Sequence, residues 1–262
     1  MNIVVCIKQV PDTNDVKIDK KTNTLMRQGV KSIINPYDMH AIESGLRLRE
    51  EFGGKVTVIS MGPSQVKDSL KEAISLGVDE VILLSDRAFA GADTLATSYT
   101  LAKGIEKISG VDLIICGKQA IDGDTAQVGP GIAEHLNIPH ATYVEEIVET
   151  TEKDITVKRK LEEGYEKIRL QLPSLLTVIK EINEPRLPSI RGIIKSRQIE
   201  KIPVWTAEAI DVDKEFIGLD GSPTQVVSVS TPQLDVEAEI FEGDCDYQVN
   251  CLIKALSELK VL

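Results

Sequence analysis

Apolar residues in the first 150 positions fall into short β-branched runs, separated by longer segments in which apolar residues recur at helical spacing. The runs predict strands over residues 3–7, 56–60, 80–84 and 113–116. Because these runs are apolar without alternation, both faces of the predicted sheet would be covered by helices, as in a parallel sheet. The pattern therefore predicts a doubly wound α/β fold with a mainly parallel sheet.

The helical segments between these strands carry recognisable ends. Asn35 can act as the N-cap of a helix that has Pro36 in its first position and Asp38 in its first turn. A second helix is predicted over residues 65–76, because Gly77 follows its last apolar position. A third helix is predicted to begin just after residue 94.

Apolar and polar residues alternate after residue 150, where the continuous apolar runs end. Residues 155–160 and 165–172 predict an antiparallel hairpin that adds to the sheet, with a turn at residues 163–164. Residues 175–179 predict one further apolar strand.

The last part of the chain has little regular pattern before a predicted terminal helix over residues 249–259. We therefore expect one α/β domain over residues 1–204, followed by an arm over residues 205–262. The arm is expected to wrap on a partner, and packing on the chain's own sheet is the alternative.

A glycine-rich segment, residues 117–131, directly follows the predicted strand 113–116. Such a loop places unpaired backbone N–H groups at a helix start, where phosphate is favoured. It has neither the Gly-Lys-Ser/Thr ending of a P-loop nor a G-x-G-x-x-G fingerprint. Asp122 and Asp124 are expected to accept hydrogen bonds from backbone N–H groups or ribose hydroxyls, because carboxylates repel phosphate. The alternative is an ordinary strand-to-helix connection with Thr125 as N-cap.

Four segments follow predicted strands and meet at one sheet edge: residues 8–12, 61–63, 86–93 and 117–126. Ligands of open parallel sheets collect beyond the carboxyl ends of the strands. The last two segments are the richest in glycine, alanine and aspartate. Position and composition therefore favour a nucleotide site over an ordinary connection.

Charge limits the partners that we expect. The chain carries 41 acidic and 30 basic residues, a net charge of −11, which disfavours nucleic acid and anionic membranes. Residues 185–201 are the exception, with five basic residues, one acidic residue and interleaved leucine and isoleucine. This segment predicts either a core-facing helix with a solvated basic side or a docking surface with an apolar centre.

The four cysteines show no zinc or disulfide spacing, and the chain shows neither a signal peptide nor a membrane span. We therefore expect a cytoplasmic protein with reduced cysteines and no metal site. The three histidines predict structural roles, and we find no catalytic motif. Any reaction chemistry would come from a cofactor.

Several motifs together resemble the β, or small, subunit of the electron-transfer flavoproteins, over nearly the whole chain. They are residues 6–10 (CIKQV), 35–38 (NPYD), 61–63 (MGP), 117–122 (GKQAID), and the stretch from 157 through 173 into 183–186 (NEPR). The resemblance implies a heterodimer in which the α subunit holds one FAD and the β subunit holds a second nucleotide.

That second nucleotide is AMP in respiratory members and FAD in electron-bifurcating members. The loop at residues 122–130 and the small-residue segment at residues 89–94 resemble the bifurcating type. The resemblance therefore implies FAD, with NADH as donor, ferredoxin or flavodoxin as low-potential acceptor, and an acyl-CoA dehydrogenase or related flavoenzyme as the other partner. An AMP-binding structural subunit is the alternative, and an unrelated nucleotide sensor is a third hypothesis.

The resemblance also implies site residues. Those around adenine and ribose would be Cys6, Asn35, Tyr37, Asp38 and Met61. The phosphate loop would be Asp122, Gly123, Asp124, Thr125, Ala126, Gln127, Val128 and Gly129. Room for the flavin would come from Ala90, Gly91, Asp93 and Thr94. The partner would be bound by Leu187, Ile190, Arg191 and Ile193, with Ile190 as the apolar anchor.

Overall fold

The computed structural model describes residues 1–12, 18–19, 24–25, 32–227 and 238–261. The chain divides into a compact unit, Met1–Val227, and a second unit, Ser228–Leu262. The first unit is built on a sheet with the strand order β11 (Gly164–Gln171), β10 (Asp154–Leu161), β9 (His140–Thr150), β12 (Ser174–Val178), β8 (Leu113–Gly117), β1 (Asn2–Cys6), β6 (Lys55–Met61), β7 (Glu80–Leu84) and β13 (Val204–Trp205).

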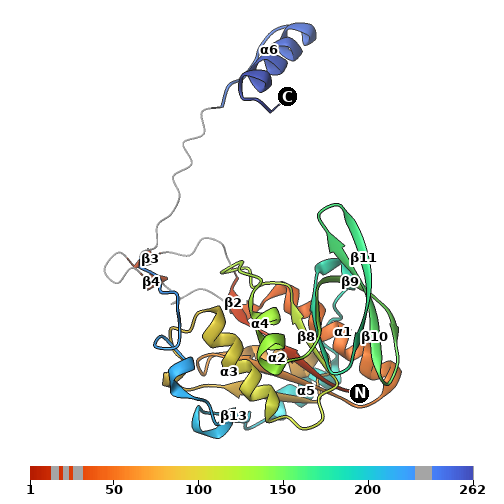
Figure 1. Ribbon diagram of the computed structural model, residues 1–262, viewed down its shortest axis with the longest axis vertical. Helices are drawn as coiled ribbons and strands as arrows, with labels where there is room; N and C mark the ends of the chain where they lie inside the picture. The colour runs from red at the N-terminus through yellow and green to blue at the C-terminus, as the bar shows by residue number, and fades with distance from the viewer. Residues whose placement is uncertain (13–17, 20–23, 26–31, 228–237, 262) are drawn as a thin grey trace. The chain divides into compact units, whose positions relative to one another are not determined.

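Strand directions confirm the predicted architecture. All neighbours from β9 to β13 are parallel. β10 pairs antiparallel with both β9 and β11. β10 and β11 form the predicted hairpin, which is drawn in green in Figure 1, and its turn contains Gly164 at a φ of 128°. The fold is therefore a doubly wound, mainly parallel sheet with an antiparallel addition.

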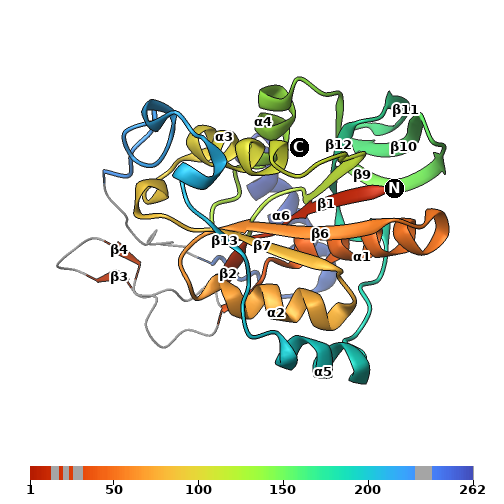
Figure 2. The ribbon, with the colours of Figure 1, turned by 90° about the horizontal axis from the view of Figure 1, so that it is seen from below.

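Helices cover both faces of this sheet, as Figure 2 shows. One face carries α1 (Pro36–Phe52) and α2 (Val66–Leu76), with α5 (Ile190–Gln198) packed on α2. The other face carries α3 (Thr94–Glu106) and α4 (Val128–Leu136), which pack on each other. The predicted helices at residues 36, 65–76 and 94 are confirmed.

Alternation along β1 explains the two cores. Ile3 and Val5 belong to the buried cluster under α1 and α2, whereas Val4 and Cys6 belong to the cluster under α3 and α4. Successive side chains of a strand point to opposite faces, so a strand covered on both sides needs apolar residues at every position. The uninterrupted apolar runs in the sequence reflect this double burial.

The strand β9 was not predicted. Its sequence contains glutamates at positions 145, 146 and 149, and only Ala141 and Val144 are buried among its residues. The strand leaves the covered part of the sheet along its length, so its pattern lacks the apolar continuity of the central strands. Two small sheets complete the described part of this unit: β2 (Gln9–Pro11) with β5 (Ser32–Ile34), and β3 (Ile18–Asp19) with β4 (Thr24–Leu25).

Residues 205–227 belong to the first unit, where Ile210 and Ile217 are buried in the core under α3 and α4. The described residues of this unit include four short 3₁₀ helices: η1 (Arg87–Phe89), η2 (Lys180–Ile182), η3 (Glu208–Ile210) and η4 (Lys214–Phe216). The second unit contains α6 (Cys245–Glu258), four residues longer at its start than the predicted helix, and residues 228–237 of the expected arm lie outside the described residues. None of the described helices has the length and apolar character needed to span a bilayer.

Candidate functional site

Asp38 in the first turn of α1 joins the carboxyl ends of two neighbouring strands. The backbone N–H of Lys8, after β1, donates to Asp38 Oδ2 at 2.7 Å. The N–H of Gly117, the last residue of β8, donates to Asp38 Oδ1 at 3.2 Å. The carboxyl group is buried, and burial raises the pKa of Asp38 to about 7 even though these N–H groups favour the carboxylate.

Asn35 makes a second cross-connection. It occupies the predicted N-cap position of α1, but its side chain is engaged elsewhere. Its amide nitrogen Nδ2 donates to the carbonyl of Gln119 at 2.8 Å, and its Oδ1 accepts from the N–H of Ile121 at 3.1 Å. The side chain makes no capping bond to α1. An amide presents both a donor and an acceptor, so it can satisfy both backbone groups of this half-buried part of the loop. Asn35 and Asp38 together hold the loop after β8 against the start of α1.

The aspartates of that loop are engaged with side chains. Lys8 Nζ lies 2.6 Å from Asp122 Oδ1, and Gln119 Nε2 donates to Asp124 Oδ1 at 2.6 Å. The expectation that backbone N–H groups bind these carboxylates is therefore wrong for the described residues, because longer side chains reach them first. Contact of these carboxylates with ribose hydroxyls stays a prediction.

The backbone dihedral angles at residues 124–127 are those of an anion-binding nest. Asp124 and Ala126 have positive φ angles of 49° and 54°, and Gln127, with φ −100° and ψ −25°, is right-handed. A left-handed residue followed by a right-handed one forms a concave nest of N–H groups that suits an anion. The N–H groups of residues 125–129 have no acceptor within the described parts of the chain.

The helix after this turn, α4, begins at Val128, and no side chain caps it. Thr125 is therefore not the N-cap, and the ordinary-connection alternative that relied on it is wrong in this respect. The free N–H groups of the first turn of α4 add to the nest. The arrangement has the donor geometry that suits an anion at a helix start, beyond β8, and the binding of a phosphate there stays a prediction.

Two glycines shape this site, and a third does not. A Cβ atom on Gly129 would lie 2.5 Å from Thr177 Cγ2, and one on Gly117 would lie 2.3 Å from Asp38 Oδ1. Gly123 has open space around a Cβ position and no positive φ. The close packing of residue 117 on Asp38 and of residue 129 on Thr177 therefore requires glycine, whereas position 123 does not.

Two lysines lie at this edge, and the sequence argument assigned them no role. Lys8 pairs with Asp122. The Lys118 ammonium lies 5.3 Å from the ring centroid of Tyr37 and 5.4 Å from that of Tyr143. Their position in the sequence could have indicated a role at this edge, because Lys8 directly follows the first predicted strand and Lys118 follows the fourth after one glycine.

The remaining residues predicted around adenine lie at the same edge. Cys6 ends β1 and pairs in register with Cys116 of β8. Both are buried, and a hydrogen bond with Cys6, together with burial, raises the pKa of the Cys116 thiol. Met61 ends β6 and is half-buried. Cys6 is therefore a buried residue at this edge of the sheet.

The segment between β7 and α3 is also at this edge, two strands beyond β1. Ala90 and Gly91 are exposed, whereas Asp93 and Thr94 are half-buried. Asp93 Oδ1 caps α3 through the N–H groups of Leu95, at 2.9 Å, and Ala96. Its Oδ2 accepts from the N–H and hydroxyl of Thr224. Burial opposes the charge, but these bonds lower the pKa of Asp93 overall. Asp93 therefore fixes the segment, and Ala90 and Gly91 provide its open surface.

The basic segment carries two highly exposed apolar side chains. Leu187 is 87% exposed and Ile190 is 81% exposed, so the alternative that Ile190 faces the core is wrong. Arg191 is exposed and Ile193 is half-buried. Ser189 Oγ caps α5 by accepting from the N–H of Gly192 at 3.0 Å.

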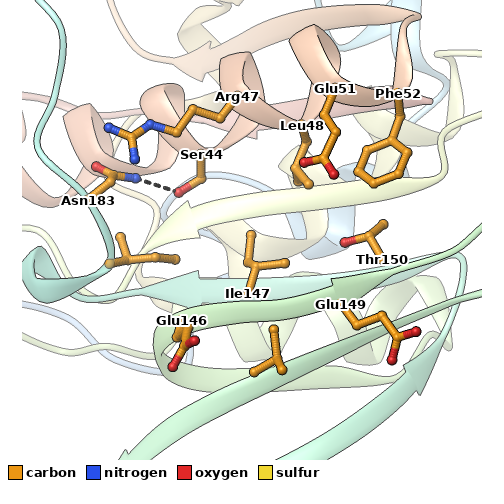
Figure 3. A pocket seen from close by; sticks show the side chains of 12 residues that line it. Ser44, Arg47, Leu48, Glu51, Phe52, Glu146, Ile147, Glu149, Thr150 and Asn183 are labelled. Carbon is orange, nitrogen blue, oxygen red and sulfur yellow. Dashed lines mark hydrogen bonds between the residues drawn. The ribbon is translucent and has the colours of Figure 1, made fainter.

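A separate cavity of about 260 Å³ lies between α1 and β9 (Figure 3). Its lining includes Arg47, Phe52, Glu146, Glu149 and Asn183. None of the residues of the carboxyl edge discussed above contributes to it. The cavity and the candidate anion site are therefore different places on the unit.

Known proteins resemble the chain along most of its length. Residues 22–208 match the family model described as the electron transfer flavoprotein domain. The electron transfer flavoprotein subunit beta of Thermoanaerobacterium thermosaccharolyticum is 54% identical over 262 residues, which is the whole of both chains. The caffeyl-CoA reductase-Etf complex subunit CarD of Acetobacterium woodii is 48% identical over 264 residues and all of both chains. The protein FixA of Azotobacter vinelandii is 47% identical, over 99% of this chain and 94% of its own.

Proposed function

The chain belongs to the electron transfer flavoprotein family as a β subunit, and from this premise we propose that it holds FAD and receives electrons from NADH. The observation that carries the proposal is the set of N–H groups at residues 125–129, at the carboxyl edge of the sheet, which have no acceptor among the residues that the structure describes. Subunits of this family pair with an α subunit. The nucleotide would therefore lie in the β part of a heterodimer.

The residues present fit a dinucleotide. The nest at Ala126 and Gln127 and the first turn of α4 would bind the pyrophosphate through the backbone, and Gly129 leaves room beside Thr177. Tyr37 and Met61 would flank the adenosine part, with Asn35 and Asp38 holding the loops that surround it. A bound flavin supplies hydride acceptance and single-electron transfer, which no side chain of this edge provides.

The open segment at Ala90 and Gly91 favours FAD over AMP, because a flavin needs space beyond the adenosine part. The similarity to CarD, named as a subunit of a caffeyl-CoA reductase-Etf complex, favours a subunit that serves a larger redox assembly. We propose electron bifurcation, with ferredoxin or flavodoxin as the low-potential acceptor and a cytoplasmic location.

The second acceptor would dock on the segment that carries Leu187 and Ile190. An acyl-CoA dehydrogenase or related flavoenzyme is proposed for this position, with Ile190 in an apolar pocket and Arg191 at the charged rim. The helix α6 is proposed to contact the α subunit, because none of its described residues is buried and Leu252 and Ile253 are each 49% exposed.

Nucleotide extraction from the purified heterodimer tests the central proposal. We expect a second flavin in addition to that of the α subunit, and we expect NADH to bleach flavin absorbance under anaerobic conditions. A single flavin accompanied by AMP would replace the proposal with the AMP-binding structural subunit. If the heterodimer contains neither a second flavin nor AMP, the proposed nucleotide site of the β subunit is refuted.

A further inference from the structure

The helix α1 contacts both proposed sites, and its later turns hold the motif at residues 183–186. The amide of Asn183 donates to Ser44 Oγ at 2.8 Å and to the carbonyl of His40 at 3.0 Å. Figure 3 shows Asn183 reaching Ser44 at one end of the cavity between α1 and β9. Arg47 Nη2 donates to the carbonyl of Glu184 at 3.2 Å. Each of these contacts joins the motif to α1.

Arg186 makes the strongest of the contacts to α1. Its Nε donates to Glu43 Oε2 at 2.7 Å, and its Nη2 donates to Glu50 Oε2 at 3.0 Å. Its backbone N–H also donates to Glu43 Oε2 at 3.2 Å. One planar guanidinium therefore bridges two carboxylates two turns apart on the helix, a geometry that a lysine cannot reproduce.

Charge and burial make this contact specific. The Glu43 side chain is only 5% exposed, whereas that of Glu50 is 50% exposed. Burial alone would raise the pKa of Glu43, but the bonds from Arg186 and Arg47 lower it overall. A buried carboxylate needs such a partner, so Arg186 is held on the helix side of the segment.

The exposed apolar residues begin directly after this contact. Leu187 follows Arg186, and Ile190 comes three residues later at the first position of α5. On the far side, Gly192 lies against α2, where a Cβ would be 2.0 Å from the carbonyl oxygen of Ser75. The short stretch that presents Leu187 and Ile190 is therefore held at both ends. A surface ordered before binding loses less entropy when a partner docks.

We propose that Arg186 is a positioning residue for electron delivery, which fixes the stretch 187–190 against α1 in the orientation that a redox partner recognises. This inference rests on the proposed docking function of that stretch. It assigns a role to the 183–186 motif, and it places that role on the same helix whose first turn holds the nucleotide loops. Arg186 would act on partner affinity and not on the reacting groups.

The test uses the complete heterodimer and an acyl-CoA dehydrogenase that accepts electrons from the unmodified protein. Arg186→Met removes the guanidinium, and Arg186→Lys keeps only a point charge. The matched control is Arg169→Met, which removes an exposed arginine from its pair with the half-buried Asp154 on the hairpin. Flavin content, melting temperature, NADH reduction without partner, and KM and kcat for the dehydrogenase are measured for each variant.

We expect Arg186→Met to raise the KM for the dehydrogenase by about tenfold. Flavin content, NADH reduction and kcat at saturating partner should stay close to those of the unmodified heterodimer. The KM of Arg186→Lys should lie between those of the unmodified heterodimer and Arg186→Met, and Arg169→Met should leave the KM unchanged. Hydrogen exchange of the amides at residues 187–194 should become faster in Arg186→Met, while exchange at residues 35–38 does not change.

An unchanged KM in folded Arg186→Met heterodimer would overturn the proposal, and so would an equal rise in the Arg169→Met control. If Arg186→Met does not fold, Arg186→Met combined with Glu43→Gln replaces it, because the buried carboxylate is then removed together with its partner. An unchanged KM in that folded double variant would refute the positioning role. Ile190→Ala separates the docking function from the role of Arg186. If Ile190→Ala does not affect the KM, the docking function of the stretch is refuted. If Ile190→Ala raises the KM and the Arg186 variant does not, only the role of Arg186 is refuted.

Discussion

Asp38 makes the stability of this subunit depend on pH in a direction opposite to that of an ordinary paired carboxylate. Its two oxygens accept hydrogen bonds from the N–H groups of Lys8, after β1, and Gly117, at the end of β8. Burial raises the pKa of Asp38 from 3.8 to about 7. In the unfolded chain the same group ionises at its ordinary value. Asp38→Asn removes the titration and leaves a side chain of similar size.

The sign follows from proton binding. Between about pH 4 and pH 7 the folded state keeps a proton on Asp38 that the unfolded state has lost, so the free energy of unfolding falls as pH rises. Each unit of pKa difference corresponds to about 1.4 kcal/mol, which gives a total of about 4 kcal/mol for Asp38. This stabilisation is fully present below about pH 4, and it is lost once the pH exceeds about 7.

Denaturant unfolding of the nucleotide-free subunit at a series of pH values measures the effect. The difference in unfolding free energy between the unmodified protein and Asp38→Asn should fall by about 4 kcal/mol from pH 4 to pH 7 and then level off. Other carboxylates contribute equally to both proteins and cancel in the difference. A flat difference, or a carboxyl carbon resonance of Asp38 that titrates near pH 4, would refute the argument.

Three further substitutions test the site and the docking stretch. Gly129→Ala should lower the free energy of unfolding by about 1 to 3 kcal/mol through the contact with Thr177, and it should weaken nucleotide binding. Gly123→Ala is the matched control, because a Cβ there meets open space. Equal behaviour of the two variants in melting and nucleotide assays would contradict the proposed position of the nucleotide. Ala126→Gly should stabilise the apo subunit by about 1 kcal/mol, because the φ of 54° favours glycine, and a lower melting temperature would argue against this strain. Ile190→Ala should raise the KM for the dehydrogenase about 30-fold, equivalent to about 2 kcal/mol, without changing thermal stability, and a destabilised protein with normal turnover per folded molecule would exclude the anchor role.

The central strands and their helices could be predicted because double burial leaves an uninterrupted apolar signal in the sequence. β9 could not, because its glutamates at positions 145, 146 and 149 follow neither the buried nor the alternating pattern over its length. The start of α1 shows a different limit. Capping rules are local, whereas the partners of Asn35 lie 84 and 86 residues away in the loop after β8. A residue type that suits a cap also suits such a long-range contact.

The candidate site was predictable as a place and only partly as a set of contacts. Strand order brings the loops after β1, β6, β7 and β8 to one edge, and the glycine-rich composition of residues 117–131 marks the loop that we propose to bind the nucleotide. The nest depends on the positive φ of Ala126, a residue with no strong preference for that conformation. Side-chain pairs such as Lys8 with Asp122 depend on tertiary distances that spacing does not encode.

The basic segment shows why periodicity alone leaves core and surface undecided. Ile190, Ile193 and Ile194 have helical spacing, which is equally consistent with a buried stripe and with an exposed one. The outcome depends on how the chain enters the helix: Arg186 is held on α1 by Glu43, and Gly192 is pressed on α2, so the first turn of α5 projects away from the core. The exposure of Ile190 is therefore a consequence of contacts made by its neighbours. This is the physical reason to expect that partner affinity responds to Arg186, a residue that the partner does not need to touch.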